Sequence, residues 1–586
     1  MNTYNTPLNS TKKEIRVLIL EPSSTDYPIK CSTKVVSLLS EPQYEALSYV
    51  WGDVSIRDSI VLDGGPFLVT KNLAIALHHL RLPDKPRRLW VDALCINQND
   101  MKERNEQVAM MGEVYLHAKP VVIFLGEAFD DSDEALGFIS TVSEEAEITE
   151  EISIRFFSFY MRLVEKEWFT RLWTVQELVL ATQDPLIGCG FAWTTWSKLL
   201  KLWQKVARKE FSKMGMVIMD TKERSADNQG ELSGVLPNCI KVDLLNNLRT
   251  AVCNSGGEEL QDLLLNTVSA NATEPKDRVY GLLGMMHNED RQLLTVDYGR
   301  TLGVVYAEAI AHIFRKGTGP YLLSGMELAG KSPSDPSLPS WVPVLGSKTL
   351  TSPIRYHPPG VGVSGAGSGA KNGIVDPDLK TLRVRGMHID IVYEKERFGE
   401  GKGLLAQLPR IEALVTKAHE LAKSKSEHRP YLNNFKNKEP LWRTLIANKA
   451  YSGSVREIAP EIYGEMYESL LKQQSRDGVE GNNMEDFTRD YRLALLNHLP
   501  GGCFFITETG FYGISEDTTE VGDHLAIWFG TPAPFVLKPI SHSGKVTGGG
   551  AYSVRGVAYV AGIMDGEIVD EVYCEDLEDD IVFIVQ

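Results

Sequence analysis

Three apolar segments separated by helix-like segments constrain the fold of this chain more than any other feature. The segments are residues 44–50 (YEALSYV), 89–96 (LWVDALCI) and 121–125 (VVIFL), and the last is purely apolar. Apolar residues recur at helical spacing in both intervals, at Leu73, Ala76, Leu77 and Leu80 and then at Val108, Met111, Tyr115 and Ala118. Alternation of strands and helices predicts a mainly parallel sheet with helices on both faces.

The rest of the chain predicts three further regions. We expect an α/β domain over residues 1–215, with a hairpin at 59–70 around Asp-Gly-Gly-Pro and a helix capped by Thr70. A mainly helical region with a Pro/Gly-rich loop follows at 216–375, beginning with a polar linker near 221–232. Strands and then helices occupy 376–500, and short strands with turn signals such as Asp565-Gly566 indicate an antiparallel β module, barrel or sandwich, at 501–586. We expect the strand segment 382–393 to join that module.

Composition excludes several classes of protein. Lys and Arg number 61 and Asp and Glu 78, a net charge of −17, so anionic partners such as nucleic acid and membrane surfaces are disfavoured. No stretch approaches the roughly 18 apolar residues of a membrane span, and the N-terminus has no signal-peptide pattern. Seven scattered Cys without a CxxC pair indicate reduced thiols in a cytoplasmic protein. No His/Cys set has the spacing of a metal site.

Three further patterns fit catalytic motifs without the required context. Residues 325–332 match a Walker A sequence, but three prolines follow within seven residues and prevent the helix that holds phosphate. Residues 360–365 match GxGxxG after Pro-Pro instead of a strand, which indicates a loop. Cys95 with an unplaced His would make a nucleophilic dyad, although its apolar segment favours a buried structural thiol.

Three segments in the first third suggest a family. They are residues 44–53 (YEALSYVWGD), 89–98 (LWVDALCINQ) and 171–178 (RLWTVQEL). In this order they resemble the fungal heterokaryon-incompatibility (HET) domain, and residues 277–284 and 296–298 resemble segments that often follow it. The resemblance implies a role in non-self recognition that ends in programmed cell death.

HET domains are similar to Toll/interleukin-1-receptor (TIR) domains, which implies a flavodoxin-like sheet. Residues 44–48 resemble the TIR first-strand box, Asp92 stands where TIR domains carry an Asp, and residues 173–178 resemble the TIR motif Trp-Cys-x-x-Glu-Leu. This chain has Thr174 in place of the Cys, and its segment before Trp173 is longer than in TIR domains. In TIR enzymes the Glu cleaves NAD at the nicotinamide–ribose bond. The resemblance therefore implies Glu177 as catalytic residue and NAD, or a related nucleotide, as substrate, with no cofactor and no metal.

One fixed carboxylate suffices for that reaction. Nicotinamide departs neutral from a cationic pyridinium and needs no general acid, while positive charge grows on the ribose and a carboxylate stabilises it. Ligands of open α/β sheets bind where the strand order reverses, at the carboxyl ends of strands. We therefore expect the loops 48–53 and 95–98 to lie near Glu177. The expected substrate-binding residues are Ser48, Tyr49, Trp51, Gly52, Asp53, Asp92, Asn97, Gln98, Arg171 and Trp173.

The residue pattern also allows structural roles. Glu177 is equally explained as a helix carboxylate paired with Arg171, and Asn97 and Gln98 as turn residues. Trp51, Trp90 and Trp173 are equally explained as core aromatics. Two functions follow: an NAD-hydrolysing cell-death protein, or a non-enzymatic recognition module that acts by self-association as a homo-oligomer or by recruiting a protein partner.

Overall fold

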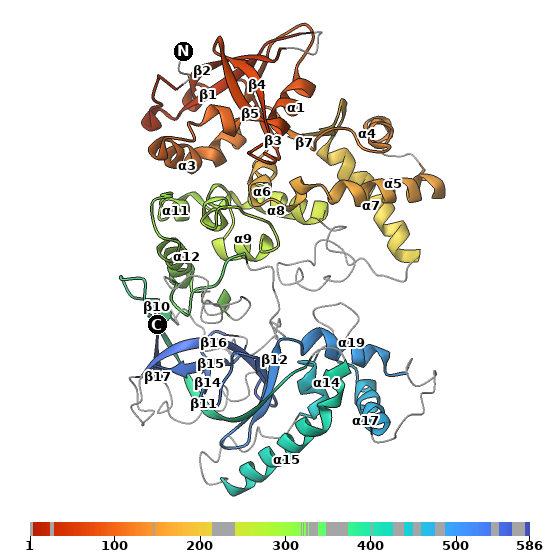
Figure 1. Ribbon diagram of the computed structural model, residues 1–586, viewed down its shortest axis with the longest axis vertical. Helices are drawn as coiled ribbons and strands as arrows, with labels where there is room; N and C mark the ends of the chain where they lie inside the picture. The colour runs from red at the N-terminus through yellow and green to blue at the C-terminus, as the bar shows by residue number, and fades with distance from the viewer. Residues whose placement is uncertain are drawn as a thin grey trace. The chain divides into compact units, whose positions relative to one another are not determined.

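Figure 1 shows a computed structural model of the chain. It describes residues 4–23, 28–143, 147–213, 241–317, 319, 322–323, 326, 338–346, 373–399, 402–425, 439–448, 459–474, 487–531, 533–540, 550–564 and 581–586. The chain divides into two units, one of residues 1–225 and 233–300 and the other of 226–232 and 301–586. The break at Arg300 falls inside the region expected at 216–375.

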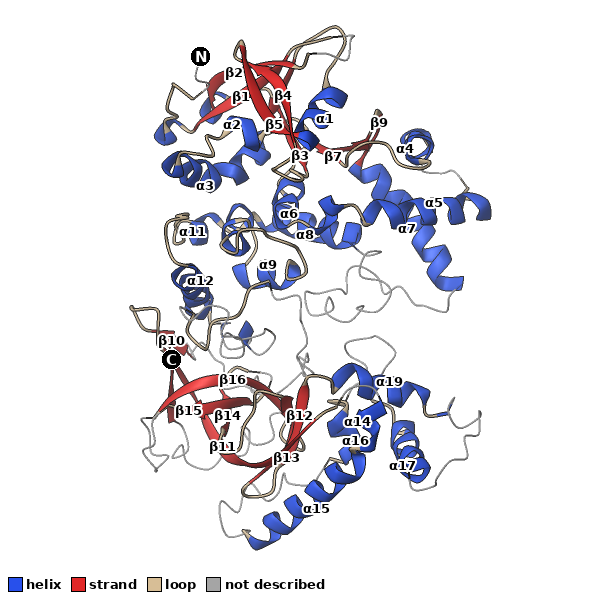
Figure 2. Ribbon diagram, in the orientation of Figure 1, coloured by secondary structure: helices blue, strands red, loops and turns tan. Residues whose placement is uncertain are grey.

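A nine-stranded sheet forms the centre of the first unit (Figure 2), in the order β5-β4-β2-β1-β6-β3-β7-β8-β9. Its strands are β1 (Glu14–Leu20), β2 (Lys30–Ser37), β3 (Glu45–Tyr49), β4 (Arg57–Leu62), β5 (Gly65–Thr70), β6 (Arg87–Trp90), β7 (Val121–Phe124), β8 (Leu186–Cys189) and β9 (Ala192–Thr195). The three strands predicted from the apolar segments, β6, β3 and β7, are neighbours as expected.

The prediction of a mainly parallel sheet is wrong, because the sheet is mixed. The central strands β6, β3, β7 and β8 run parallel to one another, and β2 runs parallel to β4. The antiparallel pairs are β1–β2, β1–β6, β4–β5 and β8–β9. Short loops join β4 to β5 and β8 to β9, and a short loop forces strands to reverse direction. The four central parallel strands can be numbered 1 to 4 by their order along the chain. Across the sheet, as β6, β3, β7 and β8, they then lie in the order 2-1-3-4. The flavodoxin-like and TIR-like assignment stays a prediction.

The segment predicted as one strand at 89–96 is half strand and half helix. After β6 ends at Trp90, the chain forms the helical turn α2 (Asp92–Cys95). The Cys95 N–H donates to the Val91 carbonyl at 2.7 Å, and the Asp92 carboxylate accepts from the Ala93 N–H at 2.7 Å. Local hydrogen bonding by Asp therefore outweighs the strand preference of the apolar residues. Asp92 follows the strand instead of ending it.

Local signals in the first unit are otherwise confirmed. Asp63 and Gly64 turn the β4–β5 hairpin with φ values of 50° and 82°, and the Thr70 hydroxyl accepts from the Leu73 N–H at 3.4 Å to cap α1. The helices are α1 (Lys71–Leu80), α3 (Met101–His117), α4 (Ser132–Thr141), α5 (Glu150–Val164), η3 (Glu167–Thr170), α6 (Leu172–Val179), α7 (Trp196–Lys213), α8 (Lys241–Ser255), α9 (Leu260–Asn266), α10 (Asp277–Tyr280) and α11 (Asn288–Arg291).

The second unit contains a closed β-barrel, as the turn signals of its C-terminal part indicate. Strand β11 (Leu382–Arg397) pairs through its first part with β14 and through its last part with β12, which closes the ring β11-β12-β13-β16-β15-β14. The segment 382–393 therefore joins this module, as predicted. The other strands are β10 (Gly373–Val375), β12 (Gly502–Thr507), β13 (Tyr512–Glu516), β14 (His524–Trp528), β15 (Phe535–Pro539), β16 (Ala551–Val560) and β17 (Ile581–Val585).

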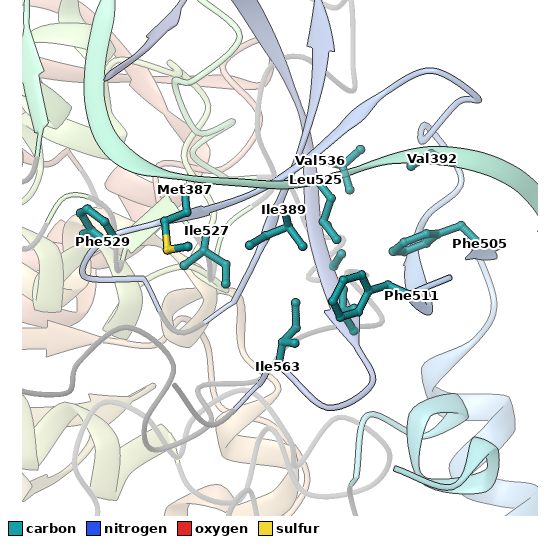
Figure 3. Close-up of a cluster of buried hydrophobic side chains, with 12 residues drawn as sticks. Met387, Ile389, Val392, Phe505, Phe511, Leu525, Ile527, Phe529, Val536 and Ile563 are labelled. Atoms are coloured by element: carbon teal, nitrogen blue, oxygen red, sulfur yellow. The ribbon is translucent and has the colours of Figure 1, made fainter. Parts of the chain in front are cut away.

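Apolar side chains fill the barrel (Figure 3). Met387 and Ile389 of β11 point toward Ile527 of β14 and toward Ile563, and each of these side chains is at most 3% exposed. All described ladders are antiparallel except the short parallel pair of β16 with β17. The helices of this unit are α12 (Leu302–Lys316), α14 (Lys402–Ala406), α15 (Leu408–Ser424), α16 (Leu441–Leu445), α17 (Ile462–Gln474) and α19 (Arg489–His498).

Several sequence-based expectations lie outside the described residues. They are the polar linker at 221–232, the Walker A match apart from Met326, the GxGxxG match at 360–365 and the Asp565-Gly566 turn. Among the helices that the structure describes, none combines the length and apolar character needed to cross a bilayer.

Candidate functional site

Glu177 lies against the carboxyl end of β3. It sits on α6, which packs on β3, and its side chain accepts a hydrogen bond from the Ser48 hydroxyl. Ser48 is fully buried and Glu177 is only 5% exposed. Ser48 pairs with Ile123 of the parallel strand β7, so this contact lies between the two strands where the order of the parallel core reverses. Ligands bind at such a position in open α/β sheets.

Trp168 extends this contact to a third residue. Its indole N–H donates to the Ser48 hydroxyl oxygen at 2.8 Å, and the side chain is fully buried. Trp168 lies on η3, directly before α6. Thr174, which replaces the Cys of the TIR motif, joins the two elements, because its hydroxyl donates to the carbonyls of Trp168 and Arg171 at 2.9 and 2.8 Å.

The environment of Glu177 favours a proton on its carboxyl group. Burial raises the pKa of Glu177 from 4.5 to about 7, and the charge of Asp92 acts in the same direction. The Ser48 hydroxyl, the Arg171 guanidinium and the Tyr115 hydroxyl oppose that rise but do not cancel it. Glu177 is therefore not permanently ionised at neutral pH, as an exposed Glu would be. It titrates near neutral pH, which is frequent among functional carboxyl groups.

The loops after β3 and β6 meet at the same edge of the sheet, as predicted. The Trp51 indole N–H donates to the Asp92 carboxylate at 2.8 Å, and the Gln98 amide donates to the Asp92 carbonyl at 3.1 Å. Burial of the Asp92 carboxyl raises its pKa, and the Trp51 hydrogen bond opposes this effect. The charge of Asp92 in turn acts on Glu177 and raises the pKa of that carboxyl group.

Arg171 is not the ion-pair partner of Glu177. Its guanidinium donates to the Tyr49 carbonyl at 2.8 Å, and no ion pair joins Arg171 to Glu177 in the described part of the chain. Tyr49 itself is 5% exposed, and its hydroxyl has no hydrogen-bond partner among the described residues. A buried hydroxyl without a partner is costly, so a ligand or water is a natural partner for it.

The Trp173 side chain is held by a later segment of the same unit and not by Glu177. Its indole N–H donates to the Asp277 carboxylate at 2.8 Å, and the Tyr298 hydroxyl donates to the other oxygen of that carboxylate at 2.6 Å. Gln176 accepts from the Gly284 N–H at 3.0 Å, and a Cβ on Gly284 would lie only 2.4 Å from the same amide oxygen. Residues 277–298 therefore hold α6 from outside, and Gly284 permits the close approach.

Gly52, Asp53 and Asn97 have roles in turns. Gly52 has a φ of 70°, and a Cβ there would lie 2.5 Å from the Asn72 amide nitrogen. The Asp53 carboxylate accepts from the Ser55 N–H at 2.8 Å, and the Asn97 N–H donates to Glu103 at 2.7 Å. These bonds show how the loops are held, and the substrate-binding role of all three residues stays a prediction.

Other chemistries have little support at this edge. Burial raises the pKa of the Cys95 thiol to about 12, so a thiolate nucleophile is disfavoured there. Cys31, Cys95, Cys189 and Cys503 are buried and Cys253 is exposed, and all five are free thiols. No group of three or more His, Cys, Asp or Glu side chains among the described residues has the arrangement of a metal site.

Sequence reasoning missed Trp168, Tyr115 and Asp277. Trp168 and Ser48 lie 120 positions apart, and Trp173 and Asp277 lie 104 apart, so no local spacing connects them. The helical spacing of Tyr115 predicts only a place on a helix face, but its hydroxyl donates to the Leu47 carbonyl at 3.2 Å beside the site. The resemblance of residues 277–284 to segments that follow HET domains was the one available signal for Asp277.

Comparisons with known proteins agree with the family suggested by the sequence. Residues 44–177 match the model of the heterokaryon incompatibility protein (HET) family, and residues 461–578 match that of the Het-6 beta-barrel domain. The chain is 26% identical to heterokaryon incompatibility protein 6, OR allele, of Neurospora crassa, over 97% of this chain and 96% of that protein. No solved structure matches it significantly. The chain is therefore similar to heterokaryon-incompatibility proteins, in the first unit to the HET domain and near its C-terminus to the Het-6 barrel.

Proposed function

We propose that this HET-domain protein hydrolyses NAD at the nicotinamide–ribose bond and thereby acts in incompatibility-triggered cell death. The observation that carries the proposal is the buried carboxyl group of Glu177, held by Ser48 between β3 and β7 at the carboxyl ends of the parallel strands. The similarity to heterokaryon incompatibility protein 6 supports the biological role. The resemblance of residues 173–178 to the TIR motif supports the reaction.

The reaction needs one negative charge at one place. As the bond between the ribose C1′ and the pyridinium nitrogen breaks, its electron pair neutralises the nitrogen, and nicotinamide leaves uncharged. Positive charge then spreads over C1′ and the ring oxygen until water adds and releases a proton. An ionised Glu177 beside the ribose stabilises that charge, and the low polarity of its buried position makes the attraction stronger than in water.

Burial also disfavours the ionised form of Glu177, and this effect should be visible in the pH dependence of the reaction. With a pKa of about 7, Glu177 is ionised in about half of the molecules at neutral pH. The active form therefore increases as pH rises through this value. We expect nicotinamide release to rise with pH between roughly 6 and 8, instead of being constant over that range as for an ordinary Glu.

Neighbouring groups suit a polar substrate. The buried Tyr49 hydroxyl offers one donor and acceptor for a ribose hydroxyl. Arg171 uses one N–H for the Tyr49 carbonyl, and a guanidinium carries further N–H donors that suit a diphosphate. The Asp92 carboxyl group, which accepts from the Trp51 indole, suits a second ribose hydroxyl.

The test is nicotinamide release from NAD by the purified full-length chain. Wild type should cleave NAD, and Glu177→Gln should lower the rate by at least about a hundredfold while the protein stays folded, because the change removes the charge and keeps the size. Glu167→Gln on the adjoining η3 is a matched control that should leave the rate unchanged. A Glu177→Gln protein as active as wild type would refute the assignment.

The alternative function is a recognition module without catalysis. The observation in its favour is that Glu177 is already bonded within the chain, by Ser48, as a structural carboxylate would be. In that case wild type releases no nicotinamide, and Glu177→Gln still triggers cell death when expressed. Nicotinamide release by wild type and cell death caused by Glu177→Gln therefore distinguish the two functions.

A further inference from the structure

Trp168, Ser48 and Glu177 form a chain of two buried hydrogen bonds. The Trp168 indole nitrogen lies 2.8 Å from the Ser48 hydroxyl oxygen, and that oxygen contacts a carboxylate oxygen of Glu177. Trp168 and Ser48 are fully buried, and Glu177 is 5% exposed. The three residues come from η3, β3 and α6, so their meeting depends on the fold of the whole sheet edge.

The chemistry of the indole fixes the direction of this chain. An indole N–H only donates, whereas a serine hydroxyl donates one proton and accepts others. Since Trp168 donates to Ser48, the hydroxyl oxygen is the acceptor of that bond, and its own proton is directed to the remaining partner. That partner is Glu177. A hydroxyl that donates to a carboxylate stabilises the ionised form.

We propose that Trp168 is a positioning residue for Glu177, which it influences by orienting the Ser48 hydroxyl as a fixed donor to the carboxylate. The proposal rests on the proposed function, because it assigns to Ser48 and Trp168 the task of keeping an ionised carboxylate available at a buried site. Ser48 is then part of the carboxylate's support rather than a substrate contact. This proposal replaces the substrate-binding role expected for Ser48.

Other charged and titratable groups act on the same carboxyl group. Asp92 of α2 raises the pKa of Glu177, and Arg171 before α6 and Tyr115 of α3 lower it. Tyr49 of β3 also interacts electrostatically with Glu177. None of these groups lies in the Trp168–Ser48 chain. A change at Trp168 that leaves them in place therefore isolates the contribution of the hydroxyl orientation.

The experiment compares pH dependence in Ser48→Ala, Trp168→Phe and wild type. Ser48→Ala removes the donor, so the midpoint of the pH–rate profile should rise by roughly one to two pH units. Trp168→Phe keeps a buried aromatic ring but frees the hydroxyl to rotate, so the midpoint should shift in the same direction by less. At high pH, where Glu177 is ionised in every variant, most of the rate should return.

Trp196→Phe is the matched control. Trp196 is also fully buried, its ring centroid lies 6.4 Å from that of Trp168, and its indole N–H has no hydrogen-bond acceptor among the described residues. Its substitution removes the same atom from the same core without touching Ser48. The profile should therefore keep the wild-type midpoint. A Trp168→Phe midpoint equal to that of wild type, in a folded protein, would overturn the proposal.

A double variant tests whether Trp168 acts through Ser48. In Ser48→Ala/Trp168→Phe the midpoint should equal that of Ser48→Ala alone, because the indole has no hydroxyl left to orient. Shifts that add would show that Trp168 affects Glu177 by another route and would refute the proposal.

Infrared difference spectroscopy separates failure of this inference from failure of the proposed function. The protonated carboxyl stretch that is lost in Glu177→Gln follows the titration of Glu177 without any substrate. If wild type does not cleave NAD, the enzyme assignment fails, and the infrared midpoints of the same variants still decide the role of Trp168. If the infrared midpoints of Trp168→Phe and wild type coincide, the inference fails whatever the activity.

Discussion

Two equally buried carboxyl groups in the molecule are held in different ways. Glu177 of the α/β unit and Asp390 of the barrel are each 5% exposed. Asp390 accepts from two backbone N–H groups, of Ile391 at 2.9 Å and Thr509 at 3.0 Å, and from the Thr509 hydroxyl at 2.7 Å. Glu177 is held by a side-chain hydroxyl, and burial raises its pKa to about 7.

The difference contrasts a carboxyl group held mainly by backbone donors with the one that we propose for chemistry. Backbone donors are fixed by the strands that carry them, so the Asp390 carboxylate is tied to the β12–β13 turn at Thr509. Side-chain donors such as Ser48 leave protonation sensitive to small changes in the surroundings. The contrast predicts that substitutions at the two positions separate activity from stability.

The largest expected effect is on activity and cell death. Glu177→Gln should lower NAD cleavage by at least about a hundredfold and abolish cell death on expression, because the transition-state charge loses its partner. Asp390→Asn should leave the specific activity of the folded protein near the wild-type value. Nicotinamide release and viability counts at matched protein levels measure both. Equal losses in the two variants would mean that the comparison of roles is mistaken.

The second prediction concerns the stability of the barrel. Asp390→Ala removes the acceptor of three buried donors, so the free energy of unfolding of the second unit should fall by about 3 to 5 kcal/mol. Glu420→Ala, at an exposed position on α15, is a control that should change it by less than about 0.5 kcal/mol. Hydrogen exchange at the β12–β13 amides reports this unit separately. Unchanged protection in Asp390→Ala would show that Asp390 is not a structural brace.

The roles of these two carboxyl groups were unequally visible in the sequence. Glu177 stands in a specific motif, so its importance was predicted, but its contact with Ser48 and its burial depend on how β3 and α6 meet. Asp390 lies within the segment 382–393, which correctly predicted a strand, and nothing local connects it to Thr509. Long-range contacts of single polar residues leave no periodicity in a sequence.

The architecture was also predicted correctly only where local interactions determine it. Helical spacing and turn residues correctly predicted α1, α3 and the β4–β5 hairpin, because each depends on interactions within a few residues. The antiparallel strands β1 and β2 were missed, and with them the mixed character of the sheet. Their pairing is set by tertiary packing against β6 and β4. Asp92 was expected within a strand, but β6 ends at Trp90 and the chain continues directly into α2.

A third prediction uses pH to separate the charge of Glu177 from its size. The pKa of Glu177 is raised from 4.5 in the unfolded chain to about 7 in the folded one, so the folded state binds more protons between these values. Wild-type stability should therefore fall as pH rises through this window, by at most about 1.4 kcal/mol per pH unit and about 3 kcal/mol in total. Glu177→Gln has no such titration.

Denaturant unfolding of the two proteins at pH 5 and pH 8 measures this effect. Glu177→Gln should be within about 1 kcal/mol of wild type at pH 5, where Glu177 of the folded protein is mostly protonated, and more stable at pH 8 by about 3 kcal/mol. The sign is informative, because a structural carboxylate gives the opposite result. If Glu177→Gln is the less stable protein at pH 8, the carboxylate stabilises the fold and belongs with Asp390.

The smallest expected effect comes from a third buried carboxyl group, that of Asp277. It is 8% exposed and, like Glu177, is held by side-chain donors, Trp173 and Tyr298. Burial raises its pKa, and the two hydrogen bonds oppose that rise. Asp277 holds α6 through Trp173 and has no part in the proposed reaction. It therefore tests whether side-chain donors alone distinguish a catalytic carboxyl group.

Tyr298→Phe removes one of the two donors to Asp277 and keeps the ring. The free energy of unfolding of the first unit should fall by about 1 to 2 kcal/mol, as for loss of a hydrogen bond to a charged group. The maximal rate of NAD cleavage should fall less than about threefold, with its pH midpoint unchanged, because Ser48 still holds Glu177. Tyr393→Phe, at a half-exposed position on β11, is the control that should change neither quantity. A Tyr298→Phe protein of wild-type stability with a hundredfold lower rate would instead place Asp277 in the reaction, and side-chain donation would then be a general mark of catalytic carboxyl groups in this molecule.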